Sequence, residues 1–340
     1  MQIRLPAEWE EQDGILLAWP HAATDWTELL EEVGQCYLAL VRAICRFERV
    51  LVVTPDADAV GAILTDAGVE PSRFTVARFP TNDTWTRDFG PLTVLVNGTP
   101  VMLDFGFNGW GLKFAADRDN QVSRLLKQND FLLPRLNTIG LVLEGGSVES
   151  DGRGTILTTS QCLLSPNRNP QLTRLDIEEA LAGLLGARRV LWLEHGWLAG
   201  DDTDAHIDTL ARLCPDDTIA YVSCPDPRDE HFAELKLMEQ ELVALRTAEG
   251  RPYRLLPLPW PAPRYDDDGQ RLPATYANFL VVNGAVLVPT YDDPADSAAL
   301  AMIALAFPGR EIIGIDCRVL IRQHGSLHCV TMQLPKGTLP

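Results

Sequence analysis

The residues of this sequence that could do chemistry are spread along the chain, and the adjacent His328 and Cys329 near the C-terminus are the most conspicuous. A cysteine can serve as a thiolate nucleophile, as a metal ligand, or as a small apolar side chain in the core. Polar clusters upstream could supply its partners, because they combine acids, a histidine and a tryptophan with turn residues. The candidate side chains in these clusters are Trp85, Asp88, Glu144, His206 and Asp208.

One interpretation of these residues is a metal site built from His206, Asp208, His328 and Cys329. No two of them show the i, i+4 histidine spacing of a helical site or the CxxC spacing of a zinc site. Adjacent ligands at 328 and 329 would also point to opposite faces of a strand. We therefore expect neither a metal nor an organic cofactor, and a structural role for His328.

A second interpretation is nucleophilic catalysis on a cation. Cys329 would attack as a thiolate and His206 would carry the proton. Carboxylates near a thiolate raise its pKa, so they are useful only if the substrate itself is positive. A guanidinium is planar, and its N–H groups match carboxylates two at a time. Asp88 and Asp208 could hold it from two sides while Trp85 lies against its flat face.

The composition of the chain fits a small cationic substrate. The net charge of the 340 residues is −18 and the sequence pI is about 4.7, which disfavours nucleic acid as a partner. The seven cysteines are scattered and lack CxxC pairs, so a reducing cytoplasm is expected. The sequence shows neither a signal peptide nor a membrane-spanning stretch, and it leaves homo-oligomer formation open.

Four hairpins recur along the chain, each marked by a tight turn between two apolar runs. Asn-Gly and Asp-Gly turns are strong hairpin signals because their residues tolerate positive φ. The turns are Asn97-Gly98, Asp151-Gly152, Pro215-Asp216-Asp217 and Asn283-Gly284. Because these turns recur at similar intervals along the chain, they indicate a pseudo-repeat built on a ββαβ unit.

Helical patterns lie between the hairpins, and most are followed by a short apolar strand. They cover residues 26–47, 119–132, 172–186, 229–250 and 293–309. We therefore predict a mixed α/β architecture of about five units in one compact domain, residues 1–340, with the units arranged around a central axis. The polar clusters precede the hairpins, so that Asp88, Glu144, His206 and Cys329 would occupy comparable places and converge on one pocket. The Pro-Asp-Asp turn soon after AHIDTLARL (205–213) favours a strand there, which would place His206 and Asp208 on one face.

Several motifs of the chain resemble those of agmatine deiminases, in the bacterial group related to peptidyl-arginine deiminases. The resemblance covers residues 5 to about 335, in the same order. The matching segments are LPAEWEEQDGILLAWPH (5–21), DTWTRDFGP (83–91), LEGGSVESDGRGTILTTSQCLL (143–164), NRNP (167–170), DDTDAHIDTLAR (201–212), RLPATYANFLVVNGAVLVP (271–289) and LHC (327–329). It implies the five-bladed α/β propeller of the pentein fold, with a central active site.

The resemblance also implies a role for each candidate residue. Cys329 becomes the nucleophile that forms a thiouronium intermediate, and His206 the general acid/base. Asp88 and Asp208 become clamps for the guanidinium beside Trp85. Glu144 would orient His206 and contact the substrate. The implied reaction is hydrolysis of agmatine to N-carbamoylputrescine and ammonia, as in putrescine biosynthesis.

Two departures from the usual motifs leave the substrate tail open. Agmatine deiminases commonly have a Gly-rich run before Asn-Ile-His-Cys, whereas this chain has Gln323-His324-Gly325-Ser326-Leu327-His328-Cys329, and Ala205 replaces the usual glycine before His206. Arginine or peptidyl-arginine deimination to citrulline is therefore the alternative. Amidino transfer and a non-catalytic binding propeller fit the residues less well. His324 and Arg322 are candidate carboxylate partners, and YDDPAD (291–296) is a candidate contact for an amine tail.

Overall fold

The computed structural model describes residues 2–340, and five of its six sheets repeat one strand pattern. In each of the five, an antiparallel pair is extended on one side by a parallel strand. The first two sheets are β19 (Met332–Pro335), β2 (Gln12–Ala18), β3 (Arg49–Thr54), β4 (Phe74–Arg78), and β1 (Ile3–Arg4), β5 (Leu92–Val96), β6 (Thr99–Gly106), β7 (Arg135–Val142). The other three are β8 (Glu149–Ser150), β9 (Thr155–Thr159), β10 (Arg189–Leu193); β11 (Ala211–Cys214), β12 (Thr218–Val222), β13 (Arg254–Leu258); and β16 (Leu280–Val282), β17 (Ala285–Thr290), β18 (Glu311–Asp316). A small hairpin of β14 (Arg264–Tyr265) and β15 (Arg271–Leu272) is separate.

The four predicted hairpins are confirmed. They join β5 to β6, β8 to β9, β11 to β12 and β16 to β17, each as an antiparallel pair. The turn between β5 and β6 shows why: Asn97 and Gly98 have φ of 50° and 84°, the positive values that an Asn-Gly hairpin turn requires.

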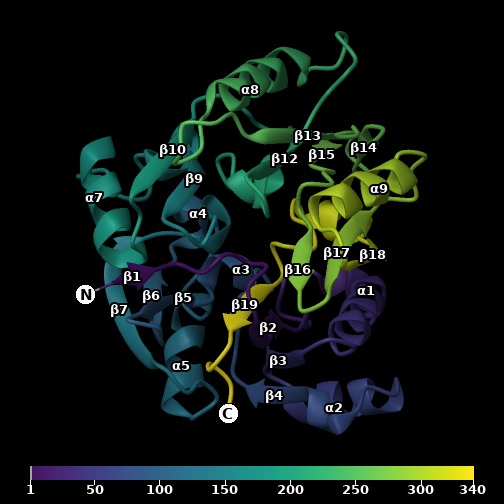
Figure 1. Ribbon diagram of the computed structural model, residues 1–340. Helices are drawn as coiled ribbons and strands as arrows, with labels where there is room; N and C mark the ends of the chain where they lie inside the picture. The colour runs from purple at the N-terminus through teal and green to yellow at the C-terminus, as the bar shows by residue number, and fades with distance from the viewer. Residues whose placement is uncertain (1) are drawn as a thin grey trace.

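Each parallel pair is joined by a crossover that contains a helix, because parallel neighbours cannot be linked by a tight turn. The longer helices lie toward the outside of the molecule and the strands toward the inside (Figure 1). These helices are α1 (Leu30–Ile44), α2 (Ala57–Asp66), α5 (Val122–Gln128), α7 (Arg174–Leu185), α8 (Phe232–Ala244) and α9 (Asp296–Ala306). Five of the six were predicted from the sequence, and α2, which Asp56 caps by accepting from the Ala59 backbone N–H, was missed.

Four strands that lie at the centre of their sheets contribute buried residues to the core. Strands β9 and β12 are buried along their whole length, and β2 and β17 are buried except for one residue each. Burial on both faces explains why they read as nearly continuous apolar runs. The rigid centre of each sheet therefore supports the loops at its ends.

One unit is completed by the two ends of the chain. Strand β19 pairs antiparallel with β2, so residues near the C-terminus take the place that a hairpin strand has in the other units. Figure 1 shows β19 beside β2. The sequence predicted about five units but only four hairpins, and this long-range pairing accounts for the difference.

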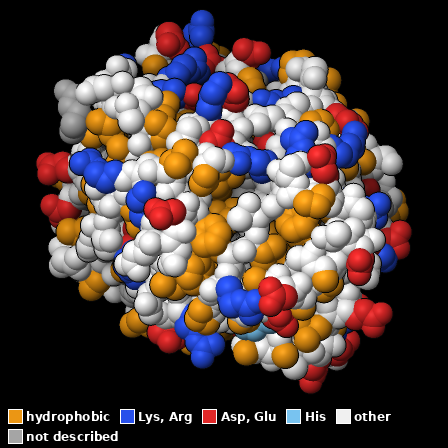
Figure 2. All heavy atoms as spheres, turned by 90° about the horizontal axis from the view of Figure 1, so that it is seen from below, with side chains coloured by type: hydrophobic (Ala, Val, Ile, Leu, Met, Phe, Trp, Pro, Cys, Tyr) orange, Lys and Arg blue, Asp and Glu red, His pale blue; other side chains and the backbone are white. Residues whose placement is uncertain are grey.

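On the face seen from below in the view of Figure 1, no one type of side chain dominates the surface. Apolar, basic and acidic side chains are interspersed there (Figure 2). Among residues 2–340, every helix is too short or too polar to cross a membrane.

Candidate active site

The candidate residues occupy the short segments that precede the first strand of each hairpin or, for Cys329, the terminal pair. Asp88 lies in α3 (Thr86–Phe89) before β5, and Glu144 caps the 3-10 turn η4 (Gly145–Ser147) before β8. His206 caps and Asp208 lies within η5 (Ile207–Thr209) before β11. Cys329 lies in a turn before β19. The prediction of comparable places in successive units agrees with these positions.

Two local predictions were wrong. His206 and Asp208 are not on an extended strand, because η5 turns the backbone there and β11 begins only at Ala211. His328 and Cys329 likewise lie in a turn, and β19 begins at Met332. The alternation of strand side chains therefore does not describe either pair.

Asp88 is buried and held by two donors. Its Oδ1 accepts from the Gly146 backbone N–H at 3.0 Å, and its Oδ2 accepts from Trp110 Nε1 at 2.9 Å. His206 Nδ1 lies 3.6 Å from Asp88 Oδ1. Burial raises the pKa of Asp88 to about 6, although the nearby His206 lowers it.

His206 is fully buried, and neither ring nitrogen has a hydrogen-bond partner among residues 2–340. Burial lowers the pKa of His206, but Asp88, Cys162 and Glu144 raise it by more, so that it reaches about 10. A protonated imidazole therefore offsets part of the negative charge around it.

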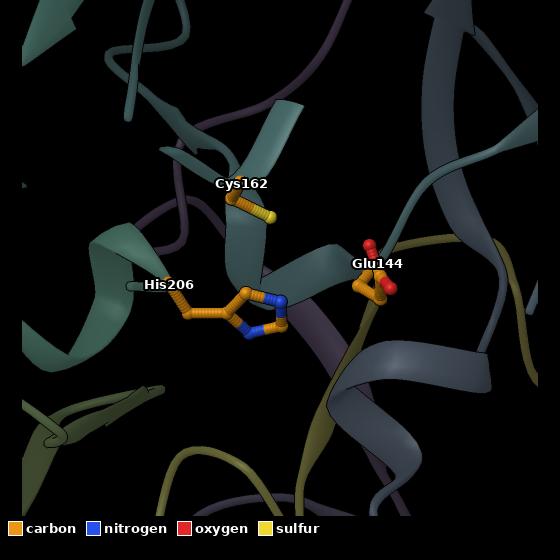
Figure 3. Close-up of side chains that lie close together, drawn as sticks. All are labelled: Glu144, Cys162 and His206. Atoms are coloured by element: carbon orange, nitrogen blue, oxygen red, sulfur yellow. The ribbon is translucent and has the colours of Figure 1, made fainter. Parts of the chain in front are cut away.

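Glu144 is fixed by Arg168 rather than by His206. Arg168 Nε donates to both carboxylate oxygens of Glu144 at 2.9 Å, and its other nitrogens donate to Asp204 Oδ2 at 2.6 Å and to the Thr203 carbonyl at 2.8 Å. The Glu144 and Arg168 side chains are fully buried. The NRNP motif, whose role the sequence left open, thus supplies the counter-charge of Glu144. Figure 3 shows Glu144 beside Cys162 and His206.

Asp208 has one carboxylate oxygen engaged and one free. His328 Nδ1 lies 2.7 Å from Asp208 Oδ2, and His328 Nε2 lies 2.7 Å from Glu8 Oε2. Asp208 Oδ1 is buried and has no hydrogen-bond partner in the part of the chain that the structure describes. His328, predicted only as a neighbour of Cys329, therefore contacts a candidate clamp directly.

A buried ion network supports His328 from behind. Arg212 Nη2 donates to Glu8 at 2.7 Å, and Arg212 Nε donates to Glu149. Arg212 also donates to the backbone carbonyls of Ala277 and Phe279, on both sides of Asn278. The network fixes the segment that contacts the candidate nucleophile.

Cys329 is buried and contacts Asn278. Its thiol donates to Asn278 Oδ1 at 3.4 Å, and the His328 backbone N–H donates to the same oxygen at 2.9 Å. Burial and the charges of Asp208 and Asp88 raise the pKa of Cys329 well above its usual value. In this arrangement Cys329 is a thiol, and a bound cation is needed to favour the thiolate. Asn278, which lies two residues before the hairpin strand β16, was not singled out from the sequence.

Cys329 borders a cavity of about 510 Å³. Trp85 and Asp88 also line it, whereas Glu144, His206 and Asp208 are not part of its lining. The Trp85 ring packs closely against Gly325, and a Cβ at position 325 would overlap it. This close packing explains why position 325, in the unusual QHGS segment, is a glycine.

The rim of the cavity is acidic. Asp25, Asp83, Asp119 and Asp202 line it together with Asp88. Burial is the main reason that the pKa of Asp83 rises to about 7 and that of Asp119 to about 8. These acids line the cavity, whereas the residues of YDDPAD (291–296), the candidate contact from the sequence, do not.

YDDPAD itself makes internal contacts. Asp292 pairs with Arg318 at 3.1 Å, and Asp293 pairs with Arg264 at 3.4 Å. Asp296 accepts from Tyr276 Oη at 2.7 Å. None of the segment lines this cavity.

The basic residues of the rim differ from the sequence prediction. His324 lines the cavity, as predicted, with its Nδ1 2.8 Å from the Gly200 carbonyl and a positive φ of 66°. Arg322 instead pairs with Asp267 at 3.0 Å. Arg118, which the sequence analysis did not identify, also lines the cavity, and it makes no ion pair among residues 2–340.

The repeated α/β sheets bring a cysteine and five carboxylates to the lining of one cavity. The chain belongs to the Porphyromonas-type peptidyl-arginine deiminase family, whose model matches residues 4–335.

Relatives across the whole length carry deiminase names. An agmatine deiminase of Pseudomonas aeruginosa (strain LESB58) is 32% identical, covering 98% of this chain and 95% of its own. The structure of a C. jejuni agmatine deiminase Cys-to-Ser variant with substrate bound is 40% identical, with a TM-score of 0.92 over 98% of this chain and 97% of that one. A structure from Porphyromonas gingivalis that bears a provisional arginine deiminase name is 50% identical, with a TM-score of 0.94 and full coverage of both chains.

Proposed function

We propose that this protein is an agmatine deiminase, which converts agmatine and water into N-carbamoylputrescine and ammonia. The observation that carries the proposal is that Cys329 borders a cavity with five carboxylates in its lining, a setting that suits a substrate cationic at both ends. The full-length relatives that bear the agmatine deiminase name support the same substrate.

The guanidinium would bind in the cavity beside Cys329, where Asp88 would accept its N–H groups and Trp85 would lie against its flat face. The fold already holds Asp88 and Trp85 in place, so these two contacts cost little conformational entropy on binding. Asp208 lies outside the cavity lining, so its buried and unpartnered Oδ1 would reach the guanidinium only after a local shift of the cavity wall.

The first half of the reaction forms a covalent intermediate. The bound cation lowers the pKa of Cys329, which loses its proton to solvent, and the resulting thiolate attacks the guanidinium carbon to give a tetrahedral adduct. Protonated His206 gives its proton to the departing nitrogen, and the C–N bond breaks. Ammonia leaves, and the enzyme holds an S-alkylthiouronium.

The second half hydrolyses this intermediate. Neutral His206 takes a proton from a water molecule, whose oxygen attacks the same carbon. The C–S bond then breaks, Cys329 leaves with its electron pair, and the O–H proton of the ureido group is lost to solvent. The product is the ureido compound, and His206 is again protonated. Glu144, held by Arg168, would add negative charge that stabilises the imidazolium and the cationic intermediates.

The five repeated sheets support a finer description of the architecture. We expect a single catalytic domain in which the five units form a five-bladed propeller of the pentein type, with the site at its centre. All seven cysteines are free, which agrees with a reducing cytoplasm as the location.

A second candidate substrate is an arginine with a free carboxylate. Arg118 at the cavity rim makes no ion pair among the described residues, so it could contact such a group, and the family description names peptidyl-arginine. The four rim acids oppose this reading, because they would repel a carboxylate.

The two substrates are distinguished by incubating the protein separately with agmatine, free arginine and a peptide that ends in arginine. Ammonia and ureido product should form fastest from agmatine, judged by kcat/KM. An Arg118→Ala variant should leave agmatine turnover nearly unchanged. Turnover of none of the three substrates would refute the proposal, and preference for arginine lost in Arg118→Ala would establish the alternative.

A further inference from the structure

A second thiol lies beside the proposed acid/base. Ligand atoms of Glu144, Cys162 and His206 all lie within 4.8 Å of one another, and all three residues are buried. Cys162 belongs to the short helix α6 (Ser160–Leu163) that follows β9, so it comes from a different segment than either partner. Figure 3 shows the three side chains pointing toward one another. The reaction proposed above does not use Cys162.

We propose that Glu144, Cys162 and His206 together form an inhibitory Zn²⁺ site. One sulfur, one nitrogen and one carboxylate oxygen form a donor set typical of zinc. Ligand atoms on a tetrahedral zinc ion lie roughly 3.5 Å apart, so shifts of about 1 Å would bring these three to an ion. Hard cations such as Mg²⁺ prefer oxygen ligands, which makes the site selective.

The unpaired ring nitrogens of His206 also point to a bound ligand. His206 is fully buried, yet both ring nitrogens lack a hydrogen-bond partner among residues 2–340. Buried polar atoms are normally paired, so an unpaired imidazole facing a thiol and a carboxylate has coordination capacity that the protein itself does not use. Zinc would displace the protons of His206 and Cys162 to solvent when it binds their nitrogen and sulfur.

A second buried cluster provides a contrast. Glu8, Glu149 and His328 also come within 4.8 Å, but both acids already hold Arg212, and both His328 nitrogens lie 2.7 Å from carboxylates. That cluster has its own cation and needs no metal.

In the cluster of Glu144, Cys162 and His206, the neighbouring cation Arg168 leaves room for a metal ion on Glu144. It contacts Glu144 through Nε alone, while its other two nitrogens are engaged by Asp204 and Thr203. Each carboxylate oxygen has two lone pairs, so Glu144 can keep Arg168 and still offer one to an ion. Arg168 would keep zinc affinity moderate and binding reversible, because it places a positive charge near the ion.

Zinc at this site would stop the reaction by occupying His206 and Glu144. This consequence rests on the proposed function, whereas the binding itself does not. A chelator should then raise the activity of zinc-treated enzyme, the opposite of its effect on a metalloenzyme. Inhibition should also weaken as agmatine concentration rises, because the ion and the guanidinium are two cations in one acidic site.

Binding is best measured on the inactive Cys329→Ser protein, in which the proposed nucleophile cannot ligate zinc. Titration with ZnCl₂ against a colorimetric chelator should show one ion per chain. Adding Cys162→Ala to Cys329→Ser should weaken affinity by at least about tenfold, since even outer partners of zinc ligands act on that scale. Adding Cys214→Ala instead, another buried free cysteine, should leave affinity unchanged. MgCl₂ should not compete.

The outcomes separate cleanly. Equal zinc affinity with and without Cys162, or no binding by Cys329→Ser, overturns the proposed site. Circular dichroism of each double variant shows whether lost binding reflects lost folding, and a folded Cys162→Ser variant with weakened binding would support the site independently. Because binding is read on an inactive protein, an error in the substrate assignment would not alter this result.

Discussion

His328 Nδ1 lies 2.7 Å from one carboxylate oxygen of Asp208, while the other oxygen of Asp208 is buried without a partner. The imidazole thereby fixes the carboxylate and leaves one oxygen for a substrate. Glu8 holds the opposite ring nitrogen at 2.7 Å, so the N-terminal segment takes part in positioning the clamp. His328 acts through Asp208 and is a positioning residue.

Replacing His328 with Gln should therefore weaken substrate binding and destabilise the fold. The variant leaves Glu8 or Asp208 short of a buried hydrogen bond, which costs about 1–3 kcal/mol of unfolding free energy. We expect KM for agmatine to rise more than kcat falls, because the proposed role of Asp208 is to bind the substrate. Urea unfolding and steady-state kinetics check both. Unchanged KM and kcat would remove His328 from the clamp, and His195→Gln, at a partly exposed pair with Glu241, is the matched control.

Replacing Gly146 with Ala should disrupt the site without removing a polar group. A Cβ there would lie 2.6 Å from His206 Nδ1 and 2.9 Å from Asp88 Oδ1. Displacement of these groups by about 1 Å can cost about a hundredfold in rate. Gly140→Ala is the control, because nothing lies within 4 Å of its added carbon. Similar kcat values for both variants would contradict the packing of His206 against Gly146.

Replacing Arg168 with Met should leave the Glu144 charge buried and unpaired. Breaking a buried pair by removing one partner costs about 3–5 kcal/mol, whereas an exposed pair contributes about 1 kcal/mol or less. Arg322→Met, which removes the exposed pair with Asp267, is the comparison. Denaturant unfolding should show a large loss for the first variant and a small one for the second. Equal losses would mean that Arg168 does not pair with Glu144 in the folded protein.

Agmatine binding should tighten as pH rises through the pKa values of the rim carboxyls. Asp83, at about 7, and Asp119, at about 8, are neutral below these values and negatively charged above them. The KM for agmatine should therefore fall between about pH 6 and pH 9, and it should fall less for butylguanidine, which lacks the amine tail. The same pH dependence of KM for both compounds would show that the rim acids do not bind the tail.

Much of the architecture follows from local signals in the sequence. Asn97-Gly98 sets a hairpin because its backbone needs positive φ, and the apolar runs of β9 and β12 reflect burial on both faces. The pairing of β19 with β2 has no such signal, because it joins the two ends of the chain.

The site was predicted only in part for a related reason. Residue types and the family motifs gave Asp88, Glu144, His206, Asp208 and Cys329 as candidates. They did not show that Arg168 neutralises Glu144 or that His328 holds Asp208, because both contacts depend on how separate units pack. The expectation that 206–208 is extended failed where the capping turn η5 overrides strand propensity.

The central claim is that Cys329 attacks the guanidinium carbon and retains it. Rapid acid quenching of enzyme turning over agmatine, followed by intact-mass and peptide mass spectrometry, tests this most directly. The account predicts a mass increase equal to agmatine minus ammonia, located on Cys329 and absent from Cys329→Ser, which should be folded and inactive. Turnover by Cys329→Ser, or the same adduct on another residue, would contradict it.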